Sequence, residues 1–261
     1  MNGVCKVYDV NEDELVVLDD INLAIEEKEF VCILGSTGCG KSTLLKIMGG
    51  IEKPTLGTIS LGDDTFQNGI PANRLKDFGF VFQQHNLLNW RIVRKNLSLP
   101  LEVFKLKGKE WYNRIDEMLE IVGLQDYGNI FPHELSGGMK QRVGIARALV
   151  HNPSILLLDQ PFGALDAITR HVLALEMLSI WEKTQKTIVM VTNSVEEALL
   201  VSNRIIMLSA LPGRIEAEYV NDVPYEARTE KIGENKRYNE LRHELNLLVR
   251  KLSVASQEGE A

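Results

Sequence analysis

The chain has 261 residues, of which 44% are hydrophobic and 25% charged, a composition typical of one large globular domain or a domain with an insertion. Lys and Arg number 29 against 36 Asp and Glu, and the resulting net charge of −7 argues against broad nucleic-acid binding. No apolar run approaches the roughly 18 residues of a membrane-spanning helix, and the N-terminus lacks the pattern of a signal peptide. The 3 cysteines do not form a disulfide framework, so we expect a reducing, cytosolic compartment.

The N-terminal part of the chain is predicted to form strands. Residues 3–28 alternate apolar and polar side chains, which indicates antiparallel strands with a turn near Asn11–Asp13. Tyr8 lies in this stretch, where its ring can either stack on a nucleobase or pack within the sheet. The strand pattern alone leaves both roles open.

A phosphate-binding loop follows. The apolar run Phe30–Leu34 predicts a buried strand, and residues 44–48 have the apolar spacing of a helix. Between them lies Gly35-x-x-x-x-Gly40-Lys41-Ser42, whose glycines let backbone N–H groups converge on phosphate oxygens. In this motif the lysine places a positive charge on the β- and γ-phosphates, and the serine hydroxyl can ligate Mg²⁺. The sequence therefore predicts that the chain binds a nucleoside triphosphate.

The next stretch contains two short strands and then a helical region. Strands are predicted at residues 58–61 and 78–82, and Gln83 directly follows the second one, where an amide can reach a metal or an attacking water. Residues 86–149 show helical periodicity and are expected to form an inserted helical subdomain. Within it, Trp90 and its apolar neighbours are assigned to the core, with an exposed docking patch as the alternative.

A second helix N-terminus suited to an anion lies inside this region. Ser136 is a favourable N-cap, and Gly137 and Gly138 leave the backbone N–H groups unobstructed at the start of a helix that continues to Leu149. A monomer has little use for two sites aimed at one γ-phosphate, whereas a head-to-tail dimer does.

The remaining strands carry polar residues at their ends. The buried strand 154–159 ends at Asp159, an arrangement that holds Mg²⁺ through water beside a phosphate loop. Strand 187–192 is followed by Asn193, and residues 205–208 and 214–220 are expected to close the sheet. From residue 234 an apolar stripe predicts a helix packed on the body, with a partner surface as the alternative, and the Ser-Gln-Glu-Gly-Glu tail is expected to be disordered.

Taken together, these motifs resemble the ATP-binding subunits of ABC (ATP-binding cassette) transporters. The resemblance extends from Tyr8 to about Glu218 and depends on five features in combination: GSTGCGKS, Gln83, LSGGMKQR, ILLLD and ALD. The run 195–198 and the loop 209–214 are further similar to the nitrate/sulfonate/taurine/bicarbonate import group. A P-loop kinase or GTPase is excluded because neither class uses the LSGGM motif.

The resemblance implies roles for individual residues. Tyr8 would stack on adenine, and the ATP phosphates would be bound by Gly35, Ser36, Thr37, Gly38, Cys39, Gly40, Lys41, Ser42 and Thr43. Mg²⁺ would be held by Ser42, Gln83 and, through water, Asp159. Ser136, Gly137 and Gly138 would contact the γ-phosphate on the opposite subunit, and Asp166 would communicate across the dimer.

Two positions depart from the family pattern. The family has a glutamate that polarises the attacking water where this chain has Gln160, and a histidine where it has Asn193. An amide can orient water but cannot accept a proton at neutral pH. We therefore expect ATP binding to be retained and hydrolysis at the chain's own site to be weak, through natural degeneration rather than an engineered trap. Since the LSGGM motif is intact, a further hypothesis is a heterodimer in which Ser136–Gly138 complete the site of a competent partner.

The resemblance also implies an architecture and an assembly. The expected fold is an α/β P-loop NTPase (RecA-like) core with an antiparallel β subdomain and an inserted α-helical subdomain. The ATP-binding domain would span residues 1–220, with the insertion at about 86–149 and a C-terminal helical extension at 221–261.

The expected partners are transmembrane permease subunits, a substrate-binding protein and a second cassette, at the cytoplasmic face of the membrane. The alternatives are an ATP-dependent regulatory subunit that does not hydrolyse ATP, or a soluble ABC protein that does not act in transport. The transported substrate cannot be identified from this chain.

Overall fold

The computed structural model describes residues 1–10 and 13–258, and of residues 253–258 only the helical backbone. The chain divides into two compact units: Met1–Leu75 together with Val189–Ala261, and Lys76–Ile188. The second unit includes the whole stretch expected to form the helical insertion. Of the turn expected near Asn11–Asp13, residues 11–12 lie outside the described part of the chain.

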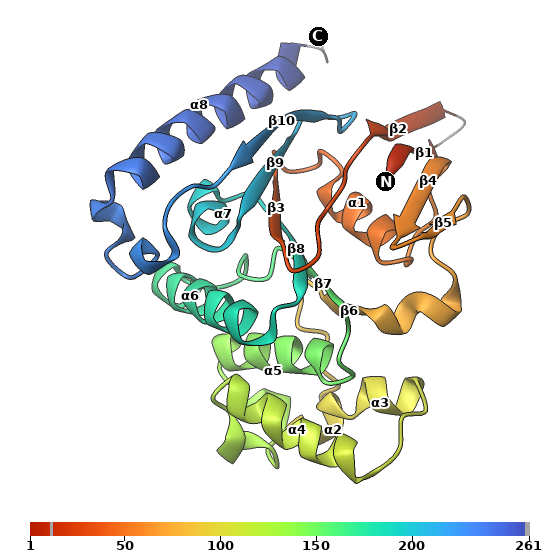
Figure 1. Ribbon diagram of the computed structural model, residues 1–261, viewed down its shortest axis with the longest axis vertical. Coiled ribbons are helices and arrows are strands. Elements are labelled where there is room, and N and C mark those ends of the chain that lie inside the picture. The colour runs from red at the N-terminus through yellow and green to blue at the C-terminus, as the bar shows by residue number, and fades with distance from the viewer. Residues whose placement is uncertain (11–12, 259–261) are drawn as a thin grey trace. The chain divides into compact units, whose positions relative to one another are not determined.

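The N-terminal strands of the first unit form a four-stranded sheet (Figure 1). Its strands are β1 (Asn2–Val10), β2 (Asp13–Ile21), β4 (Leu56–Leu61) and β5 (Asp64–Phe66), in the order β2-β1-β4-β5. Each neighbouring pair is antiparallel. This confirms the antiparallel strands that the alternating pattern of residues 3–28 predicts.

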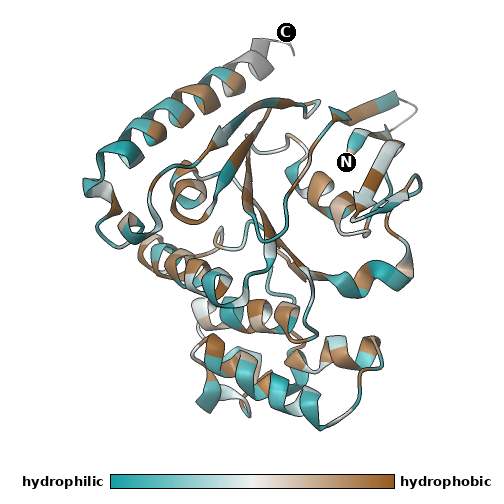
Figure 2. Cartoon of the chain, viewed as in Figure 1, coloured by the Kyte–Doolittle hydropathy of each residue, from teal (hydrophilic) through white to brown (hydrophobic). Residues whose placement is uncertain are grey.

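The core of the first unit is built around β3 (Phe30–Leu34), all of whose residues are buried. It runs parallel to β9 (Arg204–Leu208), which pairs antiparallel with β10 (Ile215–Val220). On its other side β3 borders β8 (Thr187–Thr192), a strand that begins in the second unit and continues into the first. Continuous apolar runs such as β3 and β9, brown in Figure 2, are typical of parallel strands buried on both faces.

The described residues of the first unit form the α-helices α1 (Lys41–Met48), α7 (Val195–Val201) and α8 (Lys236–Glu258). Leu241 and Leu245 of α8 are buried, and α8 packs on α7, so the first part of the predicted apolar stripe covers the body. The later residues of the stripe, Leu248, Val249 and Leu252, are half-buried. Of the tail expected to be disordered, residues 256–258 belong to α8, and residues 259–261 lie outside the described part of the chain.

The second unit pairs two parallel strands, β6 (Phe78–Val81) and β7 (Ile155–Asp159), with Phe78 opposite Ile155. Its α-helices are α2 (Val93–Leu97), α3 (Leu99–Val103), α4 (Lys109–Ile121), α5 (Gly137–Leu149) and α6 (Ala167–Thr184). At Gly79 any side chain would collide with the Ala148 carbonyl oxygen, so α5 lies directly against β6. The second unit therefore consists of a pair of parallel strands and a layer of helices, of which α5 packs on β6.

Two features of the second unit differ from the sequence-based expectations. Helix α6 was not predicted, because Ile168 and Val172 are exposed apolar residues that break the one-sided pattern of an amphipathic helix. The assignment of Trp90 to the core is wrong, since its side chain is 75% exposed, whereas its neighbour Val93 is buried.

Across the part of the chain that the structure describes, no helix combines the length and the apolar character needed to cross a membrane.

Candidate functional site

The phosphate loop, residues 35–42, joins β3 to α1 in the first unit. Gly38 and Gly40 have φ values of 85° and 97°, which side chains rarely adopt, so the loop depends on glycine at these positions. Lys41, the first residue of α1, is only 4% exposed. Its Nζ donates to the carbonyl oxygens of Gly35 at 2.9 Å and Ser36 at 2.6 Å. The loop therefore encloses a cation beside the N–H groups of a helix N-terminus, which is the environment that favours phosphate.

Asn193 lies next to this loop. It follows β8, and its Nδ2 donates to Thr37 Oγ1 at 3.4 Å. The side chain of Asn193 is exposed, whereas Thr192 before it is buried. The structure thus brings together two residues that the sequence separates widely, and it places an amide, rather than an acid or a base, at the rim of the phosphate loop.

The phosphate loop packs against β2 and against the turn 209–214. A Cβ atom at Gly40 would lie 2.8 Å from Leu18 Cδ2 and 3.0 Å from the Val17 oxygen. A Cβ atom at Gly213 would collide with the carbonyl oxygen of Cys39. Gly213 N donates to Val17 O at 2.9 Å, and Asp19 N donates to Gly213 O at 3.0 Å. The backbone of the turn is therefore clamped between β2 and the phosphate loop.

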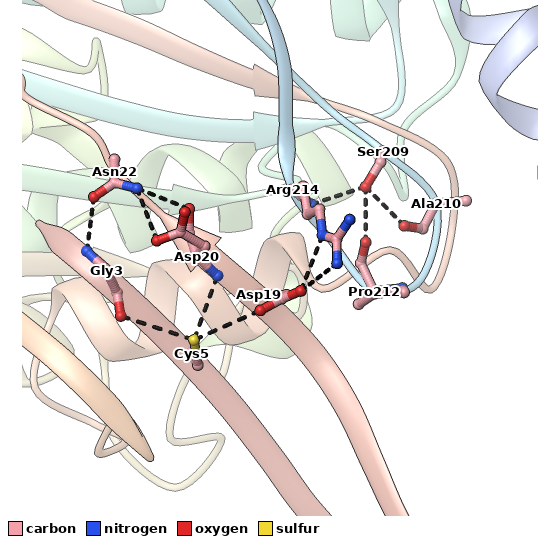
Figure 3. A network of polar contacts seen from close by, with 9 residues as sticks. All are labelled: Gly3, Cys5, Asp19, Asp20, Asn22, Ser209, Ala210, Pro212 and Arg214. Carbon is pink, nitrogen blue, oxygen red and sulfur yellow. Dashed lines mark hydrogen bonds and ion pairs between the residues drawn. The ribbon is translucent and has the colours of Figure 1, made fainter.

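Polar side chains also link β2 to the turn 209–214 (Figure 3). Arg214 Nε donates to Asp19 Oδ2 at 3.0 Å, and the two side chains form an ion pair across β2 and the turn. Ser209 Oγ accepts from Arg214 N at 2.8 Å and donates to Pro212 O at 2.7 Å. In the sequence this stretch indicates a loop between two strands and a similarity to one import group, but no local pattern reveals that Gly213 touches the phosphate loop.

Tyr8 lies on β1 in the same unit and is half-buried. Its hydroxyl donates to Glu52 Oε1, and Lys6 Nζ lies 4.7 Å from the centre of its ring. Burial raises the pKa of Tyr8, and its hydrogen bond to Glu52 adds to this effect. The pKa of Glu52 is lowered, because the hydrogen bonds from Tyr8 and Lys6 outweigh the effect of burial, which would raise it. Tyr8 therefore belongs to a polar cluster with Lys6 and Glu52.

The second unit gathers the other polar residues predicted at strand ends. Val81 of β6 lies opposite Leu158 of β7, so Asp159, which ends β7, and Gln83, which follows β6, lie at the same edge of two parallel strands. A Cβ atom at Gly163 would lie 3.8 Å from Gln83 Nε2 and 3.8 Å from Gln160 Cβ. The Gln83 amide and the Gln160 side chain therefore both lie close to Gly163 in the turn after β7.

Gln160 itself has an unusual backbone. Its φ of 43° lies in the left-handed region, and its carbonyl oxygen accepts from Gly163 N at 3.1 Å. For a residue other than glycine this conformation is strained, and such strain is concentrated at functional sites. Asp159 before it is 7% exposed, so the strand holds its carboxylate in a nearly buried position.

The segment after Gln83 is anchored to α5. Arg147 donates to the carbonyl oxygens of Asn86 at 2.7 Å and His85 at 2.9 Å. His85 Nδ1 is 2.7 Å from Gln141 Oε1. Burial lowers the pKa of Arg147. Sequence reasoning missed these anchors, because α5 and Gln83 are far apart in the chain and no local pattern links them.

Helix α5 begins with the predicted Ser-Gly-Gly motif. Ser136 is the N-cap, and its Oγ accepts from Met139 N at 3.3 Å, which confirms the predicted cap. Ser136 and Gly137 are exposed, and Gly138 is half-exposed. Asp166 caps α6 in the same way, with Oδ1 accepting from Thr169 N at 3.0 Å, and hydrogen bonds from Thr169 lower its pKa.

The expected magnesium ligands are distributed over the two units. Ser42 is the second residue of α1 in the first unit, and Gln83 and Asp159 are in the second. Among the described residues no group of three or more His, Cys, Asp or Glu side chains could hold a metal ion. By their chemistry, hydroxyl, amide and carboxylate oxygens are ligand types that suit Mg²⁺, a hard cation that keeps several waters and shares its coordination with substrate phosphates.

Comparisons with known proteins agree with this geometry. The family model described as ABC transporter matches residues 18–163, more than half of the chain. An aliphatic sulfonates import ATP-binding protein, SsuB, of Bacillus cereus is 42% identical over 225 residues, 86% of each chain. A nitrate import ATP-binding protein, NrtD, of Synechococcus elongatus is 39% identical over 255 residues, 96% of this chain and 91% of its own.

A solved structure agrees as well. The dimeric ATP-binding cassette MJ0796, in a post-hydrolysis state bound to ADP and Pi, superimposes with a TM-score of 0.73 and 37% identity, over 85% of this chain and 98% of its own. This confirms the predicted α/β P-loop NTPase fold.

Proposed function

This chain belongs to the ABC transporter family of ATP-binding proteins, and from that premise we propose that it is the energy-coupling subunit of a membrane importer. The observation that carries the proposal is the phosphate loop, with Lys41 enclosed by the loop and Asn193 at its rim. The names of relatives that import aliphatic sulfonates, nitrate or taurine support a small anion as the transported substrate.

The proposed nucleotide is ATP with Mg²⁺. Lys41 and the N–H groups at the start of α1 would bind the phosphates, and Tyr8 would stack on adenine. Ser42, Gln83 and Asp159 would hold the metal, which neutralises phosphate charge when bound. The exposed Ser136–Gly138 segment would contact the γ-phosphate bound by a second cassette, and Asp166 would lie at the seam between the two cassettes.

Hydrolysis at the chain's own site is proposed to be weak. Gln160 and Asn193 can orient a water molecule and donate hydrogen bonds, but neither amide can accept its proton at neutral pH. General-base assistance contributes typically 10²–10⁴-fold, or about 2.7–5.4 kcal/mol of transition-state stabilisation. Binding should lose far less, since Lys41 and the glycines of the loop are all present. Replacing a carboxylate at position 160 also removes its repulsion with the γ-phosphate, which favours an ATP-bound state.

The proposed assembly follows from the contrast between the weak hydrolysis expected at the chain's own site and its intact Ser-Gly-Gly motif. A chain that binds ATP, hydrolyses it poorly and presents an intact Ser-Gly-Gly motif suits a heterodimer with a competent cassette. The permease subunits, a substrate-binding protein and a position at the cytoplasmic face of the membrane are proposed with it. Within the chain, residues 1–220 would be the ATP-binding domain, with the helical insertion at about 86–149 and the C-terminal extension at 221–261.

The experiment is affinity purification of the tagged chain from detergent-solubilised membranes. We expect a polytopic membrane protein in stoichiometric amount, together with a cassette that has glutamate at the position equivalent to Gln160. Recovery of the chain only from the soluble fraction, without a membrane protein, would contradict an importer subunit. The two amides favour a second candidate, a regulatory subunit that binds ATP without hydrolysing it, and a membrane complex whose transport proceeds normally without the chain would support that candidate.

A further inference from the structure

The residues around Tyr8 form a connected cluster that no predicted role includes. Lys6 and Tyr8 lie on β1, and Glu52 lies just beyond the C-terminal end of α1. Glu52 accepts a hydrogen bond from the Tyr8 hydroxyl and forms an ion pair with Lys6 at 3.0 Å. The Lys6 ammonium also donates to the Lys53 carbonyl oxygen at 3.0 Å and lies over the Tyr8 ring. Three side chains therefore fix one another in place.

This cluster connects Tyr8 to the helix that begins at the phosphate loop. Glu52 N donates to Lys46 O at 3.2 Å, which ties the carboxylate to the last turn of α1. The position of the ring is therefore linked, through Glu52, to the C-terminal end of the helix whose first turn would hold the phosphates.

The two faces of the ring are not equivalent. A cation lying over an aromatic face is attracted to it, and the side chain of Lys6 is only 14% exposed, so it is held over the ring and does not move freely in solvent. A base that stacks on Tyr8 without displacing this ammonium must use the opposite face.

We infer that Lys6 and Glu52 are positioning residues for the nucleobase, which hold the Tyr8 ring at a fixed place relative to α1 with one face under Lys6, so that adenine would stack on the other face. The inference rests on the proposed ATP-binding function. A platform fixed before binding loses less freedom when the nucleotide arrives, which increases the affinity for ATP but not for a ligand that lacks the base.

The test separates base from phosphate by titrating the purified chain with MgATP and, in parallel, with magnesium tripolyphosphate. The variant Tyr8→Ala should weaken ATP binding about tenfold, since it removes the stacking surface. The variants Tyr8→Phe, Glu52→Gln and Lys6→Met should each weaken ATP binding about threefold, because the ring remains but is no longer fixed. Tripolyphosphate affinity should stay unchanged in all of them, which also shows that the variants are folded.

Two further variants control for charge. Glu27→Gln, which changes an exposed carboxylate of the same unit, should alter neither affinity. Lys6→Arg should retain ATP affinity, because a guanidinium can also cover the ring and pair with Glu52.

The possible outcomes distinguish this inference from the proposed function. If the unaltered chain binds neither ligand, the proposed function fails. If Tyr8→Ala weakens ATP binding while Tyr8→Phe, Glu52→Gln and Lys6→Met do not, only the positioning role fails. Tighter ATP binding by Lys6→Met would also overturn the inference, since it would mean that adenine competes with the ammonium for the same face.

Discussion

Two helix N-termini in this chain are suited to bind phosphate, and they are built in opposite ways. Helix α1 is preceded by a glycine with positive φ, has no side-chain cap, and begins with a lysine that is 4% exposed. Helix α5 is capped by Ser136, and its Ser-Gly segment is exposed to solvent. The first end is enclosed by its own loop, whereas the second presents its donors to solvent. In the proposed dimer, each chain would enclose one half of a composite phosphate site and present the other half to its partner.

The largest expected change in ATP affinity comes from altering the enclosed N-terminus of α1. Lys41→Ala removes the cation that the loop surrounds and should weaken ATP binding by about 100-fold, since hydrogen bonds from charged groups contribute about 1.5–3 kcal/mol each. Isothermal titration with MgATP measures the change. Lys107→Ala, which removes an exposed lysine of the other unit, is the matched control and should bind as the unaltered chain does. Equal affinities for the two variants would show that α1 is not the phosphate site.

The second prediction concerns the rate of ATP hydrolysis. Gln160→Glu combined with Asn193→His restores a general base and its partner, and should raise ATP turnover at least about tenfold. Steady-state phosphate release measures it. Gln160→Glu combined with Lys41→Ala is the control and should remain inactive. If the restored pair left turnover unchanged, the two amides would not be the cause of slow hydrolysis.

The third prediction tests what supports the enclosed end. Gly213→Ala places a methyl group against the Cys39 carbonyl oxygen, so the turn or the phosphate loop must shift. We expect ATP affinity to fall about fivefold and the free energy of unfolding to fall by about 1–3 kcal/mol, the usual cost of overpacking. Gly233→Ala is the matched control, since a Cβ atom there would have nothing within 4 Å. ATP titration and thermal unfolding measure both quantities, and identical behaviour of the two variants would argue against a supporting role for the turn.

The smallest effect is expected from altering the solvent-exposed N-terminus of α5. Ser136→Ala removes the cap that accepts from Met139 N and should lower the free energy of unfolding by about 1 kcal/mol. ATP binding by the isolated chain should not change, because Ser136 is proposed to serve the partner's site. Ser136→Asp, which retains a capping oxygen, should recover most of the stability in chemical denaturation. Weaker ATP binding by the dilute, monomeric Ser136→Ala chain would mean that the two helix ends serve the same site.

The sequence predicted the local parts of this architecture well. Phe30–Leu34 and Lys41–Met48 form the strand and helix expected on either side of the glycine-rich turn, because apolar runs and glycine spacing are local signals. The cap at Ser136 and the strand ending at Asp159 follow from equally local patterns. Helix α6 was missed because exposed apolar residues obscure its periodicity.

The contacts that position the site could not be predicted in the same way. The hydrogen bond from Asn193 to Thr37 and the approach of Gly213 to Cys39 join segments more than 150 residues apart in the chain, and no spacing rule connects them. Trp90 was assigned to the core because large apolar residues are usually buried, and its 75% exposure depends on the tertiary arrangement of the helices in its unit. Motifs therefore identify the chemical groups, whereas the fold decides which of them meet.

The most direct test of the account identifies the nucleotide that the chain retains. The purified chain is incubated with ATP and Mg²⁺, passed rapidly over a desalting column, and the bound nucleotide is extracted and separated into ATP and ADP. A site that binds through Lys41 but has amides at positions 160 and 193 should retain mostly ATP. Bound ADP with rapid phosphate release, or no bound nucleotide at all, would contradict the account.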